Sequence, residues 1–328
     1  MHTNTTIGIV LTVYNIICIT FDAFSYVFYI MFLSFLIRSL LKKDPAVSSS
    51  FFIIVTVNGI LDILFLAEEY FIYRIPETGF LEEFYTVTLP GSLIAGMCYT
   101  YYICQLIYIA LSGITLTFNR LFAIQWPHKY QQFWSGWRLF LFIIWPFFIT
   151  VPLFSLYYDS KVDYSKDEAG RLTCLLVDPA VHHVLYTSVI TTHTLALIVN
   201  GTLNTILIFK LKKRIKNSTN YNHKEKKNTV MEKFALLNFL FFIFAVSIEV
   251  AMDVASHYGE EFLYANFLSA FAIVESLLIF FTPYALLFLS KEIRGKFFSF
   301  IGLRRQRIVD VGPTTNRVAT FGNRSHLT

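Results

Sequence analysis

Seven apolar stretches, each close to the length that crosses a bilayer, divide this chain almost from end to end. The hydrocarbon core of a membrane is about 30 Å thick, so a spanning helix needs roughly 20 mainly apolar residues. Backbone amides inside lipid must be paired within one helix or around a closed barrel. The stretches show no period-two alternation, so the pattern predicts an all-α membrane protein, a seven-transmembrane helix bundle. The predicted spans are residues 21–41, 50–71, 95–121, 137–158, 184–209, 232–254 and 264–289.

The first apolar run is longer than an ordinary span. It covers residues 7–37, and Asp22 interrupts it. We therefore place the first span after the interruption and interpret residues 1–20 as a short extracellular N-terminus, in which residues 7–20 form an interfacial or signal-like segment. No small-residue cleavage site supports removal of a signal peptide. Asn4 begins an N-glycosylation sequence on the predicted outer side.

The segment after the last span predicts a short amphipathic helix. Ile293, Phe297, Phe300 and Ile301 recur at helical spacing with basic residues between them. Such a pattern in residues 291–301 is typical of a helix that lies on the inner leaflet. Residues 302–328 are polar and rich in Thr and Arg, so we expect a disordered cytoplasmic tail. The helix bundle itself then covers residues 21–300.

Lysine and arginine residues divide very unevenly between the two sides of the predicted bundle. Of the 27, 4 fall in connections on one side and 23 on the other. By the positive-inside rule the N-terminus lies outside and the C-terminus lies in the cytoplasm. The net charge of +5 is therefore a signal of topology, and nucleic acid is excluded as a partner.

Composition leaves no room for a large soluble domain or for a recognisable enzyme. Charged residues are only 15% of the chain and hydrophobic residues 55%. The sequence contains no phosphate-binding glycine loop, metal-binding helix pair or nucleophile elbow. His182, His183 and His193 do not share a helix face, so we expect neither a metal site nor a cofactor. Residues 264–289 hold no lysine, which excludes a retinal Schiff base there.

Two of the four cysteines lie on the predicted outer side. Cys98 is near the outer end of the third span, and Cys174 is in the long loop between the fourth and fifth spans. A Cys98–Cys174 disulfide is permitted on this oxidising side and would tie the loop to the third helix. The alternative is a pair of buried thiols.

Acidic residues inside the spans are the strongest candidates for a ligand site or a switch. Ionisable groups in lipid are costly and usually face the bundle interior. The candidates are Asp62 in the second span, Glu249 and Asp253 on one face of the sixth, and Glu275 in the seventh. Tyr99, Tyr101 and Tyr102 of the third span are candidate pocket residues beside Glu275. The alternatives are neutral, hydrogen-bonded packing acids and interfacial aromatic side chains.

The most specific segment closes the third span. A polar Asn119 precedes Arg120, and a proline seven residues later ends the helix in the run Phe118-Asn119-Arg120-Leu121-Phe122-Ala123-Ile124-Gln125-Trp126-Pro127-His128-Lys129-Tyr130. As a purely structural feature Arg120 is an interfacial anchor. The run resembles the third-helix signature of nematode serpentine chemoreceptors of the Srg superfamily, class gamma or class v. Pro283-Tyr284 followed by Ser290-Lys291-Glu292-Ile293-Arg294 resembles the same families.

The resemblance implies a GPCR-like chemosensory receptor with a heterotrimeric G protein and a small-molecule ligand as partners. It assigns activation and G-protein coupling to Asn119, Arg120 and Tyr130, and the basic third inner loop adds Lys212, Lys213 and Arg214. It places the protein in the plasma membrane, in the cilium of a sensory neuron, and leaves a receptor dimer open. Asn119 replaces the acid of rhodopsin-like receptors, so the salt bridge within that helix is absent and their mechanism does not transfer in detail. The alternative function is a transporter or channel subunit for a small solute.

Overall fold

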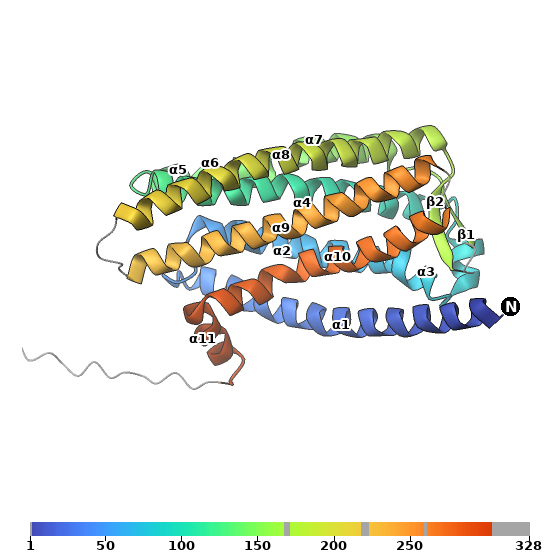
Figure 1. Ribbon diagram of the computed structural model, residues 1–328, viewed down its shortest axis with the longest axis horizontal. Helices are drawn as coiled ribbons and strands as arrows, with labels where there is room; N and C mark the ends of the chain where they lie inside the picture. The colour runs from blue at the N-terminus through green and yellow to red at the C-terminus, as the bar shows by residue number, and fades with distance from the viewer. Residues whose placement is uncertain (1, 167–170, 218–222, 259–260, 304–328) are drawn as a thin grey trace, which may run out of the picture.

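The computed structural model describes residues 2–166, 171–217, 223–258 and 261–303, and it is a helical bundle with one small hairpin (Figure 1). The elements, in chain order, are α1 (His2–Leu41), α2 (Ser50–Glu69), η1 (Tyr70–Arg74), α3 (Ile75–Glu77), η2 (Phe84–Thr88), α4 (Leu93–Gln125), α5 (Tyr130–Phe133), α6 (Gly136–Ile144), α7 (Phe147–Tyr157), β1 (Val162–Lys166), β2 (Leu172–Leu176), α8 (Pro179–Asn217), α9 (His223–His257), α10 (Glu261–Leu289) and α11 (Lys291–Phe300).

Seven helical segments within the described ranges are long and apolar enough to cross a membrane, which confirms the predicted bundle. They are Ile16–Leu41, Ser50–Glu77, Leu93–Gln125, Gly136–Tyr157, Pro179–Lys210, Leu236–Ala255 and Asn266–Leu289. Strands β1 and β2 lie at one end of the bundle, and α5 and α11 lie at the other (Figure 1). We call these the outer and the inner end, following the orientation that the charges predict.

Helix α1 is continuous through the segment at residues 7–20. It runs from His2 to Leu41, so residues 7–20 are helical and lead directly into the first span, which begins at Ile16. Asp22 does not interrupt the helix because its side chain is buried, with 2% exposed, and bonded inside the bundle. The hydrophobic run therefore forms one unbroken helix.

The second span extends beyond its apolar run through a change of helix type. Helix α2 passes into the π-helix η1 and then into α3, so Arg74 lies on the wall of the bundle instead of in a loop. Beside this wall, β1 and β2 pair antiparallel, with Tyr164 opposite Cys174. The hairpin contacts α3, η1 and α4, and it covers part of the outer end.

Helix α4, the third span, is the central element of the bundle. It packs against α2, α7, α8 and α9, and a larger share of it is buried than of the other spans. At its outer end Gly96 touches the chain before β1, because a Cβ at Gly96 would lie 2.4 Å from the carbonyl oxygen of Ser160. Only glycine permits this approach.

Proline divides the fourth span into α6 and α7. Helix α6 ends at Ile144 and α7 begins at Phe147, with Pro146 between them. Proline cannot donate the helical hydrogen bond, which explains the break. The indole N–H of Trp145 at this break donates to Thr115 Oγ of α4 at 2.8 Å. The break therefore positions a contact between helices.

Helix α11 confirms the short helix predicted after the last span. The Ser290 side chain caps it by accepting from the Ile293 N–H at 3.3 Å. Phe297 is fully buried against the aromatic side chains of α1, and Lys296 forms an ion pair with Asp44 in the first inner loop. Of the predicted tail at 302–328, residues 304–328 lie outside the described ranges.

Candidate functional site

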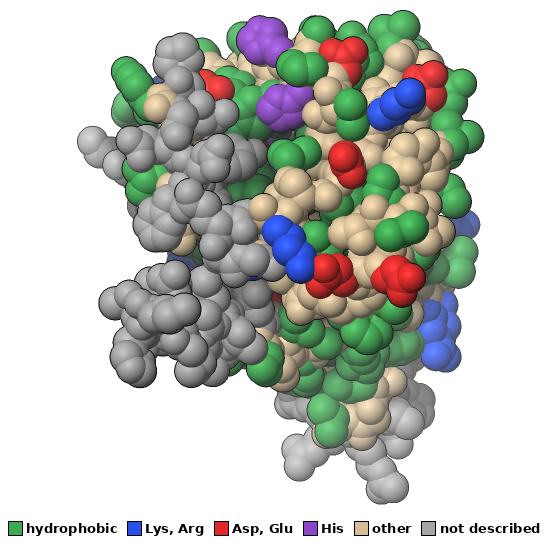
Figure 2. Space-filling model, turned by 90° about the vertical axis from the view of Figure 1, so that its right-hand side faces the viewer, with side chains coloured by type: hydrophobic (Ala, Val, Ile, Leu, Met, Phe, Trp, Pro, Cys, Tyr) green, Lys and Arg blue, Asp and Glu red, His purple; other side chains and the backbone are tan. Residues whose placement is uncertain are grey.

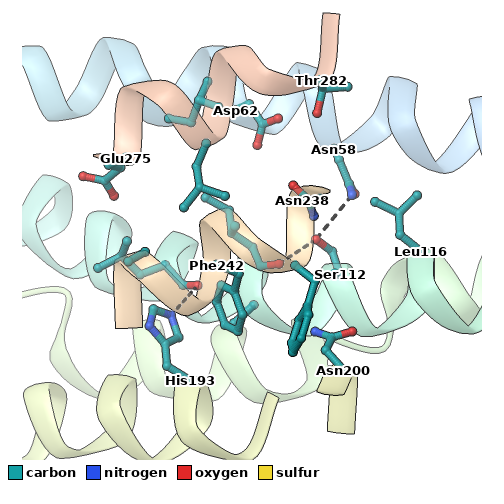
Figure 3. Close-up of a pocket in the computed structure, with 18 of the residues that line it drawn as sticks. Asn58, Asp62, Ser112, Leu116, His193, Asn200, Asn238, Phe242, Glu275 and Thr282 are labelled. Carbon is teal, nitrogen blue, oxygen red and sulfur yellow. Dashed lines mark hydrogen bonds between the residues drawn. The ribbon is translucent and has the colours of Figure 1, made fainter. Parts of the chain in front are cut away.

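A polar cavity of about 90 Å³ lies inside the bundle (Figure 3). This is several times the roughly 10–15 Å³ that one ordered water occupies by such a measure. Its polar lining comes from α2, α4, α8, α9 and α10, namely Asn58, Asp62, Ser112, Thr117, His193, Asn200, Asn238, Glu249, Glu275 and Thr282. Three of the four acids singled out from the sequence thus reach one cavity from three helices.

Glu249 is paired with a histidine across the cavity wall. The Nδ1 atom of His193 lies 2.5 Å from Glu249 Oε2, and its Nε2 atom lies 3.1 Å from the carbonyl oxygen of Leu106. The carbonyl can only accept, so Nε2 carries a proton and donates it. One further proton is shared between Nδ1 and the carboxyl group, and the pair as a whole is neutral. It joins α8, α9 and α4.

Asp62 lies deeper in the cavity and is bonded to a tyrosine of α1. Tyr29 donates from its hydroxyl to Asp62 Oδ2 at 2.9 Å. Gly59 permits this approach, because a Cβ there would lie 2.9 Å from the Tyr29 hydroxyl. One turn away Asn58 donates to Ser112 at 3.3 Å, which extends the polar contacts to α4. Asp62 is therefore held in place by neighbouring helices and still lines the cavity.

A buried charge cluster lies nearer the outer end. Arg74 Nη1 is 2.5 Å from Asp22 Oδ2, and Arg74 Nη2 is 2.6 Å from Glu69 Oε1. Nη2 also donates to Ser276 Oγ at 2.7 Å. Tyr70 donates to Asp22 at 2.8 Å. The guanidinium group therefore connects α1, the second span and α10 in a region shielded from solvent.

A second cavity, of about 50 Å³, lies under the hairpin, and it meets the first at Glu275 and Phe271, which line both. The Tyr102 hydroxyl donates to Glu275 Oε2 at 3.3 Å, so this predicted pair does lie together. Tyr99 is buried on the same helix with its ring centre 6.3 Å from that of Tyr73, and Tyr101 is half-buried. Glu275 thus stands at the junction of an outer and an inner cavity.

The hairpin is attached to the outer end by an ion pair. Arg171 Nη1, just before β2, lies 3.1 Å from Glu77 Oε1 of α3. Glu77, Arg171 and Thr173 all line the outer cavity. The hairpin therefore forms its outer wall.

The predicted Cys98–Cys174 disulfide is absent from the structure, where both residues are free thiols. The physical reason is the position of Cys174 in β2, where it faces Tyr164 across the hairpin and interacts with that phenol. Burial raises the pKa of the Cys174 thiol well above its ordinary value, and burial likewise raises the pKa of the Tyr164 hydroxyl. The alternative of two separate thiols is the one that the structure adopts.

Two hydroxyl groups and one side-chain amide are all hydrogen-bonded to one another at the inner end. Asn119 Nδ2 donates to Ser50 Oγ at 3.2 Å, and the Tyr130 hydroxyl donates to Asn119 Oδ1 at 3.0 Å. The Ser50 and Tyr130 hydroxyls are 2.7 Å apart. Asn119 and Tyr130, both singled out from the sequence, therefore hold the beginning of α2 against the end of α4.

Arg120, the next residue of α4, is buried against an aromatic ring. Its guanidinium carbon lies 3.6 Å from the ring centre of Phe51 on α2. Phe51 meets Phe234 of α9 edge-on at 5.7 Å, and Phe234 stacks on Phe281 of α10 at 5.3 Å. A cation over a ring face is attracted to its π-electrons. Arg120 therefore belongs to a contact chain that joins four spans at the inner end.

Some predicted residues lie apart from both cavities or beyond what is described. Asp253 is exposed on α9 and lines neither cavity, although Glu249, four residues earlier, does. Lys213 is exposed at the inner end of α8. The side chains of Lys212, Arg214 and Asn4 lie outside the described ones.

The sequence alone does not indicate Asp22, Glu69, Arg74 or His193 as parts of a site. One signal was available: Arg74 is the only basic residue in the connection between the second and third spans. An isolated charge beside an apolar span is often paired inside the bundle. His193 was weighed only as a metal ligand, and within the described residues no group of His, Cys, Asp and Glu is arranged to hold a metal ion.

Seven membrane-length helices around an internal cavity define a multi-pass membrane protein with a seven-helix bundle. Residues 10–303 match the family described as serpentine type 7TM GPCR chemoreceptor Srv. The match covers most of the chain, and the chain belongs to this family. Of the two classes that the sequence resembles, class v is thus the one matched. A comparison with curated proteins gives no match.

Proposed function

We propose that this protein is a chemosensory receptor that binds a small external ligand within its helix bundle and activates a heterotrimeric G protein. The observation that carries the proposal is the cavity on which Asp62, Glu249 and Glu275 converge from three different helices. A ligand that contacts several helices at once can favour one arrangement of the bundle over another. Membership of a chemoreceptor family supports the same role.

The inner end supplies the proposed output. Arg120 is buried against Phe51, and this contact depends on how α2, α4 and α9 are packed. A change in that packing would release Arg120 toward the cytoplasmic surface, where the end of α8 contributes further basic residues such as Lys213. Asn119 and Tyr130 would set the energy of the resting arrangement through their hydrogen bonds with Ser50.

The proposed location is the plasma membrane, with the N-terminus outside and the C-terminus inside. The uneven distribution of basic residues supports this orientation. Epitope tags at the two ends of the full chain, stained in intact and in permeabilised cells, should label outside and inside respectively. The opposite staining would overturn the proposed sidedness.

The central test is a G-protein activation assay in cells that express the full chain and are screened with small volatile and water-soluble compounds. We expect Arg120→Ala to abolish the ligand-evoked response at equal surface expression. Lys161→Ala, which removes an exposed cation at the outer end, is the matched control and should respond normally. An intact response in Arg120→Ala would contradict the proposal, and so would a ligand-evoked solute flux that needs no G protein.

A further inference from the structure

We propose that the two joined cavities bind a small organic cation, a protonated amine with an apolar body, and that the Glu275 carboxylate is its counter-ion. The inference rests on the proposed function, because it names the class of ligand for that same site. It starts from a carboxyl group whose bonding within the protein is incomplete.

Glu275 is buried, with 4% of its surface exposed, and it lines both cavities. Its Oε2 atom accepts a hydrogen bond from Tyr102, at 3.3 Å. Its Oε1 atom has no hydrogen-bond partner among the residues that the structure describes. A buried carboxylate without a compensating charge is costly. An ammonium group in the cavity would supply both the missing donor and the missing charge.

The basic side chains around the cavities are already engaged with acids of the protein. Arg74 is bonded to two acids, Asp22 and Glu69, and Arg171 is bonded to Glu77. His193 and Glu249 form a pair that is neutral as a whole. Among the described residues that line the cavities, Asp62 and Glu275 are the acids that are not bonded to a basic side chain. The surplus is therefore negative, which favours a cationic ligand and opposes an anionic one.

The apolar body of the ligand is indicated by the aromatic walls. Phe271 lines both cavities beside Glu275, and Phe239 and Phe242 line the inner one. Tyr73 and Tyr102, whose ring centres are 4.8 Å apart, line the outer cavity. Aromatic faces bind ammonium groups and apolar groups alike. This lining therefore suits a ligand that carries both an ammonium group and an apolar group.

The outer end offers a route for such a ligand. The outer cavity lies under the hairpin, at the end of the bundle that faces the viewer in Figure 2. Acidic side chains are spread over this face, together with Lys, Arg and His side chains and with apolar ones (Figure 2). Surface acids raise the local concentration of cations and the rate at which they arrive. Glu275 then lies where the route meets the inner cavity.

The test uses the purified full chain in lipid nanodiscs, without a G protein, and measures its melting temperature as a function of ligand concentration. The probes are phenethylamine and isoamylamine, each compared with its uncharged counterpart, phenethyl alcohol or isoamyl alcohol. We expect at least one amine to raise the melting temperature at concentrations where its alcohol does not. Glu275→Gln should weaken the apparent affinity for that amine at least tenfold, and Glu275→Asp should retain the preference for the amine.

The matched control is Asp253→Asn, which removes an exposed acid that lines neither cavity. It should bind the amine as the unaltered chain does. The inference is overturned if no amine raises the melting temperature, if the alcohols act equally well, or if Glu275→Gln keeps the amine preference. Because the assay contains no G protein, a failure of coupling does not affect it. If the unaltered chain shows no preference for the amines and still gives ligand-evoked signalling, this inference fails and the proposed function stands.

Discussion

The Arg120 guanidinium carbon lies 3.6 Å from the centre of the Phe51 ring, which makes this contact the closest cation–aromatic approach among the described residues. Both side chains are buried, and Phe51 is fully enclosed. Arg120 is on α4 and Phe51 is near the beginning of α2, so the contact joins the third and second spans. Through the edge-on contact of Phe51 with Phe234, the same ring also touches α9.

Replacing the ring in Phe51→Leu should raise ligand-independent G-protein activation. A desolvated cation–aromatic contact contributes about 2 kcal/mol. If it is lost on activation, its removal shifts the resting equilibrium by about tenfold or more. Guanine-nucleotide exchange on the G protein, normalised to surface expression, measures this shift. Phe52→Leu is the control, because Phe52 is equally buried on the same helix and its ring packs on Phe51. Equal basal activity in the two variants would contradict the prediction.

Removing the buried guanidinium in Arg74→Met should strongly destabilise the folded bundle. The change leaves Asp22 and Glu69 buried without their cation, and breaking one side of such a pair costs about 3–5 kcal/mol. Thermal unfolding in detergent, followed by size-exclusion chromatography, measures the loss. Adding Asp22→Asn to Arg74→Met should recover part of it, since the two residues are directly coupled.

The exposed pair Lys166–Glu82 provides the comparison for Arg74. Its atoms are 2.7 Å apart, yet each side chain is about half exposed. Exposed ion pairs contribute about 0–1 kcal/mol, so Glu82→Gln should shift the melting temperature little. If Arg74→Met and Glu82→Gln lowered the melting temperature equally, burial would not explain why the Arg74 ion pairs contribute more to stability.

The Cys174 thiol should react slowly with maleimide in the folded protein between about pH 7 and 9. Burial raises its pKa, and the thiolate is the reactive form. The neutral thiol is favoured in the folded state, so its contribution to stability is complete below the ordinary pKa of about 8.5. That contribution is lost as the pH rises through the folded-state pKa. Peptide mapping after labelling at several pH values gives the rate.

The same labelling experiment checks the free thiols. After denaturation without a reductant, both Cys98 and Cys174 should react at the rate of an ordinary cysteine. Labelling that appears only after reduction would reveal a disulfide and contradict this prediction.

Gly96→Ala should destabilise the outer end. The added Cβ would lie 2.4 Å from the Ser160 carbonyl oxygen and 2.9 Å from that of Tyr158, and backbone atoms cannot move aside easily. Overpacking of this kind costs about 1–3 kcal/mol. Gly113→Ala on the same helix is the matched stability control, since its nearest neighbour would be Asn200 Nδ2 at 3.6 Å. Equal melting temperatures for the two variants would argue against the close approach.

The seven spans could be predicted from the sequence because a helix that crosses lipid needs a long apolar run. The residues at which the spans end were predicted less well. The second span was predicted to end at residue 71, whereas helical structure continues through η1 and α3 to Glu77. A π-helix has no hydrophobic signature of its own, since it is defined by backbone hydrogen bonds. Arg74 therefore lies outside the predicted span although it is helical in the structure.

The sequence predicts three acids of the site, Asp62, Glu249 and Glu275, which stand out because ionisable groups are rare in spans. It does not indicate Asp22, Arg74 or His193. The bonds of these residues join positions remote in sequence: His193 bonds Glu249 across 56 residues, and Arg74 bonds Asp22 across 52. Such pairs depend on how the helices are rotated about their axes, which local patterns do not determine. Asn119 and Tyr130 were each singled out from the sequence, and the hydrogen bond between them, across 11 residues, comes from the structure.

The pairing of Asp22 with Arg74 has a consequence for the bilayer thickness that matches the first helix. With Asp22 turned inward, residues 7–37 of α1 form an apolar run of 31 residues, about 46 Å long at roughly 1.5 Å per residue. A bilayer core is only about 30 Å thick, and a helix longer than this must tilt or thicken the lipid around it. Each ångström of mismatch costs a fraction of a kcal/mol. A helix of this length is therefore accommodated with less mismatch in a thick bilayer than in a thin one.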